Sequence, residues 1–376
     1  MRLGHPERAC PVLHVAGSKG KGTLCHFLER GLRAAGFRTG LYTSPHLMDW
    51  RERIQVNGRP AADAGLADAF ERVLAAAGPE ATFFDLITAA AFETFRAGGV
   101  EIALVEVGLG GRSDSTNVVR PLAAAVTSIE REHVEVLGSD LAGIAGEKAG
   151  IFKPQAALWR GDGLPAEALA VLAARARACG SELHAAPPGA RAVPAALRGH
   201  PLAHARRSGA LAAAMLAALP PPYSSAAPAF ADLRAEDLEI PGRWERRRLR
   251  DGRSAVLDVA HTANSLRAVL EAFRAEVPDP TARGVLFALR EEKDPDRLAA
   301  EIGPRPAGER WWSCRAGNHP RSADPARLAA AFGATALAAP DFPAGPGTLL
   351  VTGSTYLVGA LRSATTPARA AAGLTA

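Results

Sequence analysis

The amino-acid sequence predicts an α/β protein of two successive domains, a larger one over residues 1–224 and a smaller one over residues 225–376. Three observations support this. A chain of 376 residues is long enough for two hydrophobic cores. Short apolar runs alternate with helical patterns along the chain, as in doubly wound α/β folds. The stretch PPPYSSAAP at 220–228 interrupts this alternation and marks the expected boundary.

The larger domain is expected to start with a strand, a glycine-rich loop and a helix. In PVLHVAGSKGKGT (11–23), the apolar run ends at Gly17, and helical spacing of apolar residues begins after Thr23. Glycines let backbone N–H groups turn toward phosphate oxygens, and the following helix adds its positive end. The pattern predicts a P-loop-type, three-layer domain in which the glycine-rich loop cradles phosphates and Lys21 adds a full positive charge.

Polar residues follow three further predicted strands of this domain. Ser44 follows the strand at 38–43, Glu106 lies near the end of the strand at 101–107, and His133 follows the strand at 122–129. Carboxyl ends of parallel strands meet at one sheet edge, where ligands bind. Glu106 resembles the acidic strand end that holds magnesium in nucleotide hydrolases, and His133 could join it around a metal. A Ser-Pro turn, a solvent-facing glutamate and a solvated histidine are the alternatives.

The smaller domain reads as a Rossmann-like α/β unit. It opens with Pro-Gly-Arg at 241–243 and a basic run at 246–250, and strands are expected to alternate with helices thereafter. Asp258 and His261 follow the strand that begins at Ser254, where they are placed to meet a ligand. A helix N-cap is the alternative role for Asp258.

Composition narrows the class of protein. The net charge is +5, and no basic run carries interleaved aromatic residues, so nucleic acid is not an expected partner. Neither a signal-peptide pattern nor a membrane-spanning apolar run is visible, which predicts a cytoplasmic protein without membrane contact. The four cysteines are widely spaced, which argues against a disulfide framework or a zinc site.

Lysine is scarce in this arginine-rich chain. A lysine that persists in such a composition indicates a need for a compact amine that can lose its proton, which arginine cannot provide. The five lysines are Lys19, Lys21, Lys148, Lys153 and Lys293.

The order of these motifs resembles the folylpolyglutamate synthase and dihydrofolate synthase family of the Mur ligase superfamily. The resemblance extends over nearly the whole chain. It rests on HVAGSKGKGT (14–23), TSPHL with RERIQVNG (43–58), EVGLGGRSDSTN (106–117), EHVEVLG with EKAGIFK (132–153), PGR (241–243), LDVAHTANS (257–265), HPRS (319–322) and VTGSTYLVG (351–359).

The resemblance implies an ATP-dependent amide ligase. ATP would convert a folate carboxylate into an acyl phosphate, and the amine of L-glutamate would attack it. Tetrahydrofolate is favoured as the acceptor over dihydropteroate, and a monomer is expected. The implied ATP contacts are Gly20, Lys21, Gly22, Thr23, Arg243, Asp258 and His261, the last three across an interdomain cleft. The implied magnesium ligands are Ser44, Glu106 and His133, with carbamylated Lys148 holding a second ion, and the implied catalytic residues are Lys21, Lys148 and His261.

Several positions depart from the family pattern. Ser18-Lys19 replaces Thr-Asn, Glu132 replaces Asp, and Thr262-Ala263 replaces Asn-Pro. A family motif whose asparagine touches the nucleotide is changed at 204–209, with Ser208 in place of that asparagine. About ten residues precede the first strand, where relatives carry several dozen, so a reduced pteroate site or a misplaced start is expected.

Two alternatives stay open. One is a related ligase that uses another carboxylate acceptor, since the acceptor is chosen by loops that a single sequence does not resolve. The other is an ATP-binding paralogue without ligase activity, suggested by Lys19 and by the changed motif at 204–209. A simple binder has no use for a lysine that holds a second metal, so the joint retention of the expected site residues argues against the paralogue. These residues are Lys21, Ser44, Glu106, His133, Lys148, Asp258 and His261.

Overall fold

The computed structural model describes residues 2–132, 134–189, 192–317 and 319–368. The chain divides into two compact units. The first comprises Met1–His46 and Trp50–Leu238, and the second comprises Leu47–Asp49 and Glu239–Ala376. In the part of the chain that is described, every helix is too short or too polar to cross a membrane.

Within the described residues, the first unit is built on an eight-stranded sheet in the order β4-β3-β2-β5-β1-β6-β7-β8. The pairings β2–β3 and β3–β4 are antiparallel and the others are parallel. The strands are β1 (Val12–Ala16), β2 (Thr39–Tyr42), β3 (Ile54–Val56), β4 (Arg59–Pro60), β5 (Ile102–Glu106), β6 (Ala123–Val126), β7 (Ala157–Arg160) and β8 (Leu183–Ala185).

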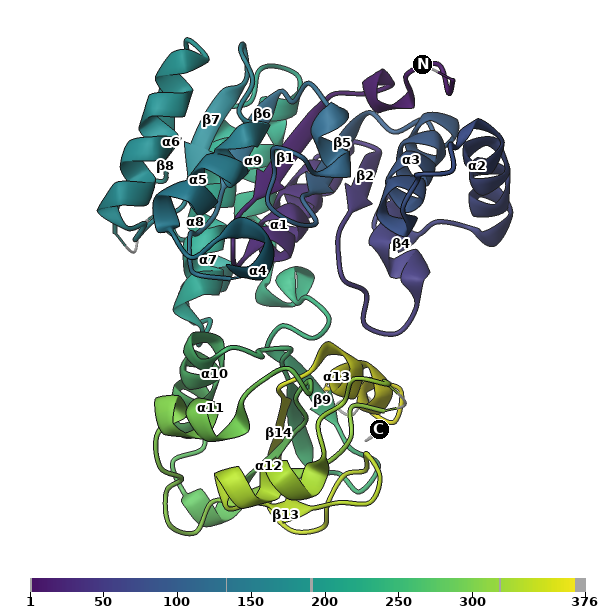
Figure 1. Ribbon diagram of the computed structural model, residues 1–376. Helices are drawn as coiled ribbons and strands as arrows, with labels where there is room; N and C mark the ends of the chain where they lie inside the picture. The colour runs from purple at the N-terminus through teal and green to yellow at the C-terminus, as the bar shows by residue number, and fades with distance from the viewer. Residues whose placement is uncertain (1, 133, 190–191, 318, 369–376) are drawn as a thin grey trace, which may run out of the picture. The chain divides into compact units, whose positions relative to one another are not determined.

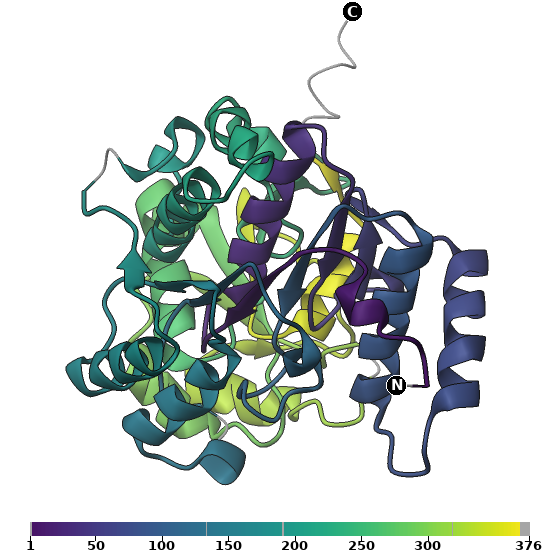
Figure 2. The same ribbon diagram turned by 90° about the horizontal axis from the view of Figure 1, so that it is seen from above.

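Helices cover both faces of this sheet (Figure 1). Side chains alternate between the faces of a strand, so Val12 and Ala16 of β1 lie on the same face. Val12 packs into the cluster that α3 covers, and Ala16 packs into the cluster that α5 and α6 cover. Helices α1, α8 and α9 contact one another, and α2 lies beside α3 (Figure 2). The three predicted layers are therefore confirmed. The helices are α1 (Lys21–Ala34), α2 (Asp63–Ala76), α3 (Phe83–Ala97), α4 (Val134–Leu137), α5 (Leu141–Lys148), α6 (Ala166–Ala178), α7 (Ala195–Arg198), α8 (Ala203–Ala217) and α9 (Ala226–Ala231).

The second unit is the smaller α/β unit that the sequence predicts. Its described residues form a seven-stranded sheet in the order β13-β12-β11-β14-β10-β9-β15, with β9 antiparallel to both of its neighbours. Its strands are β9 (Glu245–Arg248), β10 (Ser254–Leu257), β11 (Arg283–Phe287), β12 (Arg310–Ser313), β13 (Thr335–Ala336), β14 (Thr348–Thr352) and β15 (Thr366–Pro367), and its helices are α10 (Ala263–Glu276), α11 (Pro295–Ile302), α12 (Pro325–Phe332) and α13 (Thr355–Arg362).

Strand β9 was not expected, because its residues Glu-Arg-Arg-Arg read as a surface charge run. In the structure alternate residues Glu245 and Arg247 are buried. Their burial is possible because Glu245 accepts hydrogen bonds from Arg247 and from Arg362 of α13. A buried charge needs such partners, and a hydropathy pattern does not reveal them.

The division between the units falls after Leu238, whereas the proline-rich stretch suggested a boundary after Ser224. The intervening residues include α9, which packs on α1 of the first unit. Phe230 of α9 lies with its ring centroid 6.3 Å from that of Phe27. The proline-rich stretch therefore lies within the first unit, and the chain continues into the second unit after Leu238.

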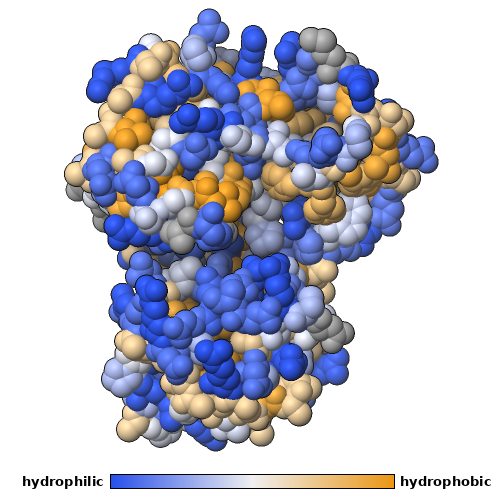
Figure 3. Space-filling model, in the orientation of Figure 1, coloured by the Kyte–Doolittle hydropathy of each residue, from blue (hydrophilic) through white to orange (hydrophobic). Residues whose placement is uncertain are grey.

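Polar side chains predominate on the visible surface, and hydrophobic ones form small separate areas there (Figure 3). All four cysteines are free thiols, as their wide spacing predicted.

Candidate active site

The glycine-rich loop joins β1 to α1, as the sequence predicts. Gly17 has φ 143° and Gly20 has φ 80°, conformations that residues with a Cβ rarely adopt. A Cβ on Gly17 would also lie 2.0 Å from Thr127 Oγ1. Glycine is therefore required at both positions, first to let the loop pass close to the end of β6 and then to start the helix.

Hydrogen bonds to the residues after β6 hold the loop in place. The backbone N–H of Lys19 donates to Ser128 Oγ at 2.8 Å, and Thr127 Oγ1 donates to the carbonyl of Lys19 at 2.6 Å. Lys21 Nζ donates to the carbonyl oxygen of Gly17 at 2.9 Å. The ammonium of Lys21 consequently lies against the loop, and Gly20, Lys21, Gly22 and Thr23 occupy the loop end and the first turn of α1.

Glu106 and Ser44 lie together beside this loop. Glu106 is the last residue of β5, it is buried, and its Oε2 accepts the backbone N–H of Ser44 at 3.0 Å. A Cβ on Gly22 would lie 3.2 Å from the same oxygen, so the carboxylate touches the first turn of α1. A buried carboxylate and a hydroxyl beside a phosphate loop are a donor set that suits magnesium.

His133, the third expected metal ligand, lies outside the described residues. Among the residues that are described, no three His, Cys, Asp or Glu side chains gather closely enough to hold a metal. Of the three expected ligands, the structure therefore brings Glu106 to the phosphate loop, with the backbone of Ser44 bonded to it. Phosphate oxygens and water would have to complete the shell of a metal there.

Lys148 ends α5 and pairs with Glu132. The lysine side chain is 2% exposed, and its Nζ donates to Glu132 Oε1 at 2.9 Å. Lys19 Nζ lies 4.0 Å from Glu132 Oε2. Burial lowers the pKa of Lys148, and Glu132 opposes this shift. Burial also raises the pKa of Glu132, but the ammonium groups of Lys148, Lys21 and Lys19 outweigh it, so this pKa lies below its usual value.

Glu132 was expected only as a departure from the family pattern and not as a member of the site. Two of the departures from the family pattern, Lys19 and Glu132, face each other in the structure. The signal that could have found the cluster is the scarcity of lysine, because three of the five lysines, Lys19, Lys21 and Lys148, act on the one carboxylate of Glu132.

In the second unit the structure brings Asp258 close to the turn that contains Arg243. Asp258 is buried, and its carboxylate accepts the N–H groups of Trp244 and Ala260, each at 2.9 Å. Burial raises the pKa of Asp258, and the charge of Arg243 opposes the shift. Asp258 is not the N-cap of α10, since that position is Thr262.

His261 has a defined tautomer. Its Nδ1 lies 2.9 Å from the carbonyl oxygen of Val259. A carbonyl only accepts, so Nδ1 carries the proton and donates it. In the neutral ring, Nε2 is therefore the nitrogen with a lone pair.

The altered motif at 204–209 still lies beside the phosphate loop. It belongs to the first half of α8, and a Cβ on Gly20 would be 3.4 Å from Ser208 Oγ. Ser208 thus presents a hydroxyl at the place where the family pattern has an amide.

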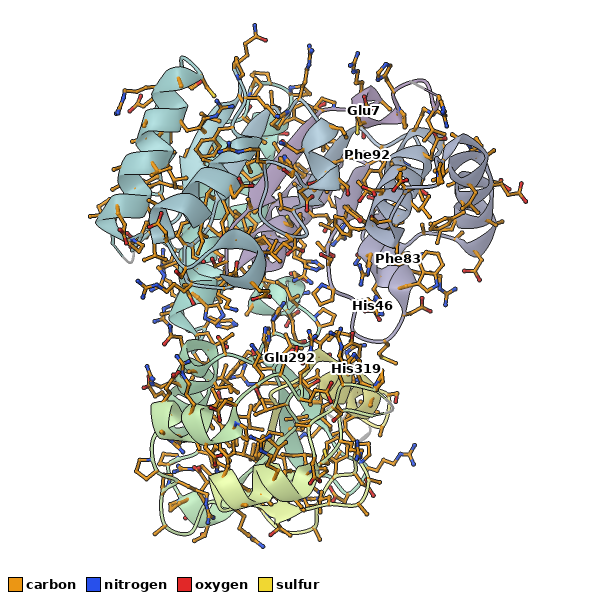
Figure 4. All side chains as sticks on the ribbon, in the orientation of Figure 1. Glu7, His46, Phe83, Phe92, Glu292 and His319 are labelled. Atoms are coloured by element: carbon orange, nitrogen blue, oxygen red, sulfur yellow. The ribbon has the colours of Figure 1, made fainter. Side chains whose placement is uncertain are left out.

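A further polar and aromatic group lies after β2, where the sequence carries the motifs TSPHL and RERIQVNG. Arg53 Nε donates to His46 Nδ1 at 2.9 Å, and its guanidinium lies 5.8 Å from the ring centroid of Phe83. Phe83, at the start of α3, is 60% exposed (Figure 4).

A phosphate loop beside a buried acidic strand end, in a mainly parallel sheet, defines a nucleotide-binding α/β protein. Two family models match the chain: "Mur ligase middle domain" over residues 15–158 and "Mur ligase, glutamate ligase domain" over residues 242–350. The class is therefore that of the Mur ligases.

Similar proteins narrow this class. A dihydrofolate synthase/folylpolyglutamate synthase of Bacillus subtilis is 42% identical over 160 residues, which are 40% of this chain and 37% of that protein. The crystal structure of Mycobacterium tuberculosis folylpolyglutamate synthase complexed with ADP and AMPPCP matches with a TM-score of 0.80 and 26% identity, over 96% of this chain and 92% of that one. The crystal structure of the bifunctional Yersinia pestis enzyme complexed with AMPPNP and a Mn ion matches with a TM-score of 0.78 and 25% identity. The match covers 96% of this chain and 92% of that one.

The chain therefore carries two Mur ligase domains, and the relatives and solved structures to which it is similar are folylpolyglutamate synthases and dihydrofolate synthases. The matched stretch spans 19% of the length of one curated relative and 44% of another.

Proposed function

We propose that this protein is an ATP-dependent ligase that joins L-glutamate to the carboxylate of a folate through an acyl phosphate. One observation carries the proposal: the phosphate loop with Lys21 lies directly against the buried Glu106 and Ser44. This arrangement supplies a cation for the phosphates and an oxygen site for a divalent metal in one place. Folylpolyglutamate synthases that bind ADP or ATP analogues have the same fold.

The residues of the loop act by position and charge. Backbone N–H groups at the start of α1 point toward the phosphates, and Lys21 exchanges its bond with the Gly17 carbonyl for phosphate oxygens. The ammonium then neutralises the charge that builds up as the terminal phosphoryl group moves to the acceptor carboxylate. Magnesium, when bound by Glu106 and Ser44, supplies further neutralisation of the phosphate oxygens.

Lys148 is proposed to act as a carbamate. Burial lowers its pKa and favours the neutral amine, whose nitrogen can bond to the carbon of carbon dioxide as it releases a proton. The product is an anion beside Glu132, and two adjacent anions are an arrangement that a second divalent ion would neutralise. Protonated Lys148 is a cation and does not fit a metal.

The other expected roles remain part of this proposal. Arg243, Asp258 and His261 are assigned to the nucleotide, and His133 to the first metal. The protein is proposed to be a cytoplasmic monomer that acts on small molecules. Tetrahydrofolate is the preferred acceptor and dihydropteroate a second one.

The experiment is a comparison of acceptors with the purified protein, ATP, magnesium and labelled glutamate. Tetrahydrofolate is expected to take up label and to release ADP in equal amount. Dihydropteroate tests the second acceptor, and a peptidoglycan-type carboxylate serves as the control for a ligase of another specificity. ATP binding without ADP release, with every pterin offered, would contradict the proposal and support an inactive paralogue.

A further inference from the structure

His14 is a buried histidine in β1 that the proposed chemistry does not use. Its side chain has no exposed surface. It shares a sheet face with Val12 and Ala16, since side chains two residues apart in a strand point the same way. Its Nε2 lies 2.9 Å from Thr116 Oγ1, while its Nδ1 has no hydrogen-bond partner in the described part of the chain. A buried polar ring in such a place calls for an explanation.

The hydrogen bonds around Thr116 have a defined direction. Thr116 Oγ1 lies 2.5 Å from Asp114 Oδ1 and donates its single proton to that carboxylate. The hydroxyl must therefore accept from His14, so Nε2 carries the proton and Nδ1 the unused lone pair. Burial, with a contribution from Lys153, lowers the pKa of His14 to about 3. The ring stays neutral at ordinary pH, and the chain from His14 through Thr116 to Asp114 keeps its direction.

The carboxylate of Asp114, which accepts the Thr116 hydroxyl, also binds the backbone of the residues after Glu106. Its Oδ2 accepts the backbone N–H of Gly108 at 3.0 Å and that of Leu109 at 2.9 Å. Glu106 is the last residue of β5, so these amides belong to the turn that immediately follows it. The direction in which the chain leaves the Glu106 position is consequently held by one carboxylate.

The same loop, residues 108–117, also packs against the end of α5. The N–H of Arg112 donates to the carbonyl of Glu147 at 2.9 Å. A Cβ on Gly111 would lie 3.1 Å from the Cα of Lys148. The loop therefore lies between the backbone of Glu106 and the backbone of Lys148.

We propose that the Thr116 hydroxyl, oriented by His14, is a positioning group that fixes loop 108–117 and thereby the separation of Glu106 from Lys148. Neither His14 nor Thr116 touches a substrate in this scheme. The inference rests on the proposed function in taking Glu106 and Lys148 as two sides of a metal–nucleotide site. Groups that orient metal ligands from behind typically change metal affinity by about 10- to 100-fold when they are removed.

The test compares Thr116→Val, which keeps the shape and removes the hydroxyl, with Thr116→Ser, which keeps the hydroxyl. Binding of Mn²⁺ to the full chain in the presence of AMPPNP is measured from the electron paramagnetic resonance signal of free Mn²⁺. Thr116→Val is expected to weaken Mn²⁺ binding roughly tenfold, and Thr116→Ser to stay within about twofold of the unchanged protein. Hydrogen exchange at the amides of Gly108 and Leu109 should accelerate in the valine variant alone.

Two results would overturn the inference: Mn²⁺ affinity unchanged in Thr116→Val, or an equal loss in both variants, which would indicate packing and not the hydroxyl. If Thr116→Val does not fold, Thr116→Ala replaces it in the same comparison. If the unchanged protein binds Mn²⁺ with AMPPNP but shows no ligase activity with ATP, the proposed function is contradicted and this test still stands. An unchanged protein that binds no Mn²⁺ with AMPPNP would overturn both.

Discussion

Two carboxylates held by cations, one in each unit, differ in how completely their partners satisfy them. Glu309 of the second unit is fully buried and accepts hydrogen bonds from Arg283 at 2.5 Å, Trp311 at 2.8 Å and Arg274 at 2.9 Å. Glu132 of the first unit is 14% exposed, bonds to Lys148 at 2.9 Å and lies 4.0 Å from Lys19.

The difference lies in the cation: arginines surround the carboxylate that holds the fold together, and lysines surround the carboxylate of the proposed site. Arginine offers several fixed donors and keeps its charge, so the group around Glu309 is closed and holds α10, β11 and β12 together. Lysine is a movable point charge that can lose its proton. The lysines around Glu132 can therefore change partners when a ligand arrives, and two of them belong to the phosphate loop and its helix.

Removal of the loop cation should have the largest effect. Lys21→Ala is expected to lower kcat by about 1000-fold or more, because no other group replaces the charge that faces the transferred phosphoryl group. Its melting temperature should stay close to that of the unchanged protein, since Lys21 bonds to one partly buried carbonyl. Steady-state ADP release measures the effect, with Lys293→Ala as a control, and a loss below tenfold would show that the loop has been misread.

Removal of the two carboxylates compares the units directly. Glu309→Gln should lower the free energy of unfolding of the second unit by about 3–5 kcal/mol, because it leaves the buried Arg283 and the partly buried Arg274 without their counter-charge. Glu132→Gln should lower the free energy of unfolding of the first unit by a smaller amount, since Lys148 can become neutral. Denaturant unfolding followed by hydrogen exchange in each unit measures both. Equal losses would remove the distinction between a closed and an exchangeable cluster.

Acid should weaken the first unit through His14. Burial lowers the pKa of this ring from 6.5 to about 3, so the unfolded chain takes up a proton before the folded one does. Stability is fully present above pH 6.5 and is lost as the pH falls toward 3. Between pH 7 and pH 5 this linkage amounts to about 2 kcal/mol. The free energy of unfolding is measured at both pH values, and its decrease from pH 7 to pH 5 should be smaller in His14→Gln than in the unchanged protein by that amount. An identical decrease in the two proteins would mean that the folded ring is protonated.

The smallest effect is expected at Lys19. Lys19→Asn should leave activity intact or improve it slightly, because a partly exposed pair at 4.0 Å contributes about 0–1 kcal/mol. The ratio kcat/KM for ATP measures it, with Lys21→Ala as the contrast. A loss as large as that of Lys21→Ala would place Lys19 on the nucleotide.

The sequence predicted what local pattern and parallel-sheet geometry determine. The phosphate loop follows from its glycines, and the meeting of Ser44 with Glu106 follows from the common edge of β2 and β5. The contacts Lys148–Glu132 and His14–Thr116 join residues 16 and 102 positions apart. Such contacts depend on how loops pack, which no periodicity reports. Strand β9 was hidden for a related reason, since its buried residues are charged.

The most direct test of the central claim follows an oxygen atom. The acceptor folate is labelled with ¹⁸O in the carboxylate that receives glutamate, and the released phosphate is analysed by mass spectrometry. An acyl phosphate intermediate transfers a carboxylate oxygen to phosphate, so labelled phosphate is expected in step with amide formation. Unlabelled phosphate released together with ADP would contradict the account, because ATP would then be hydrolysed by water without activating the folate.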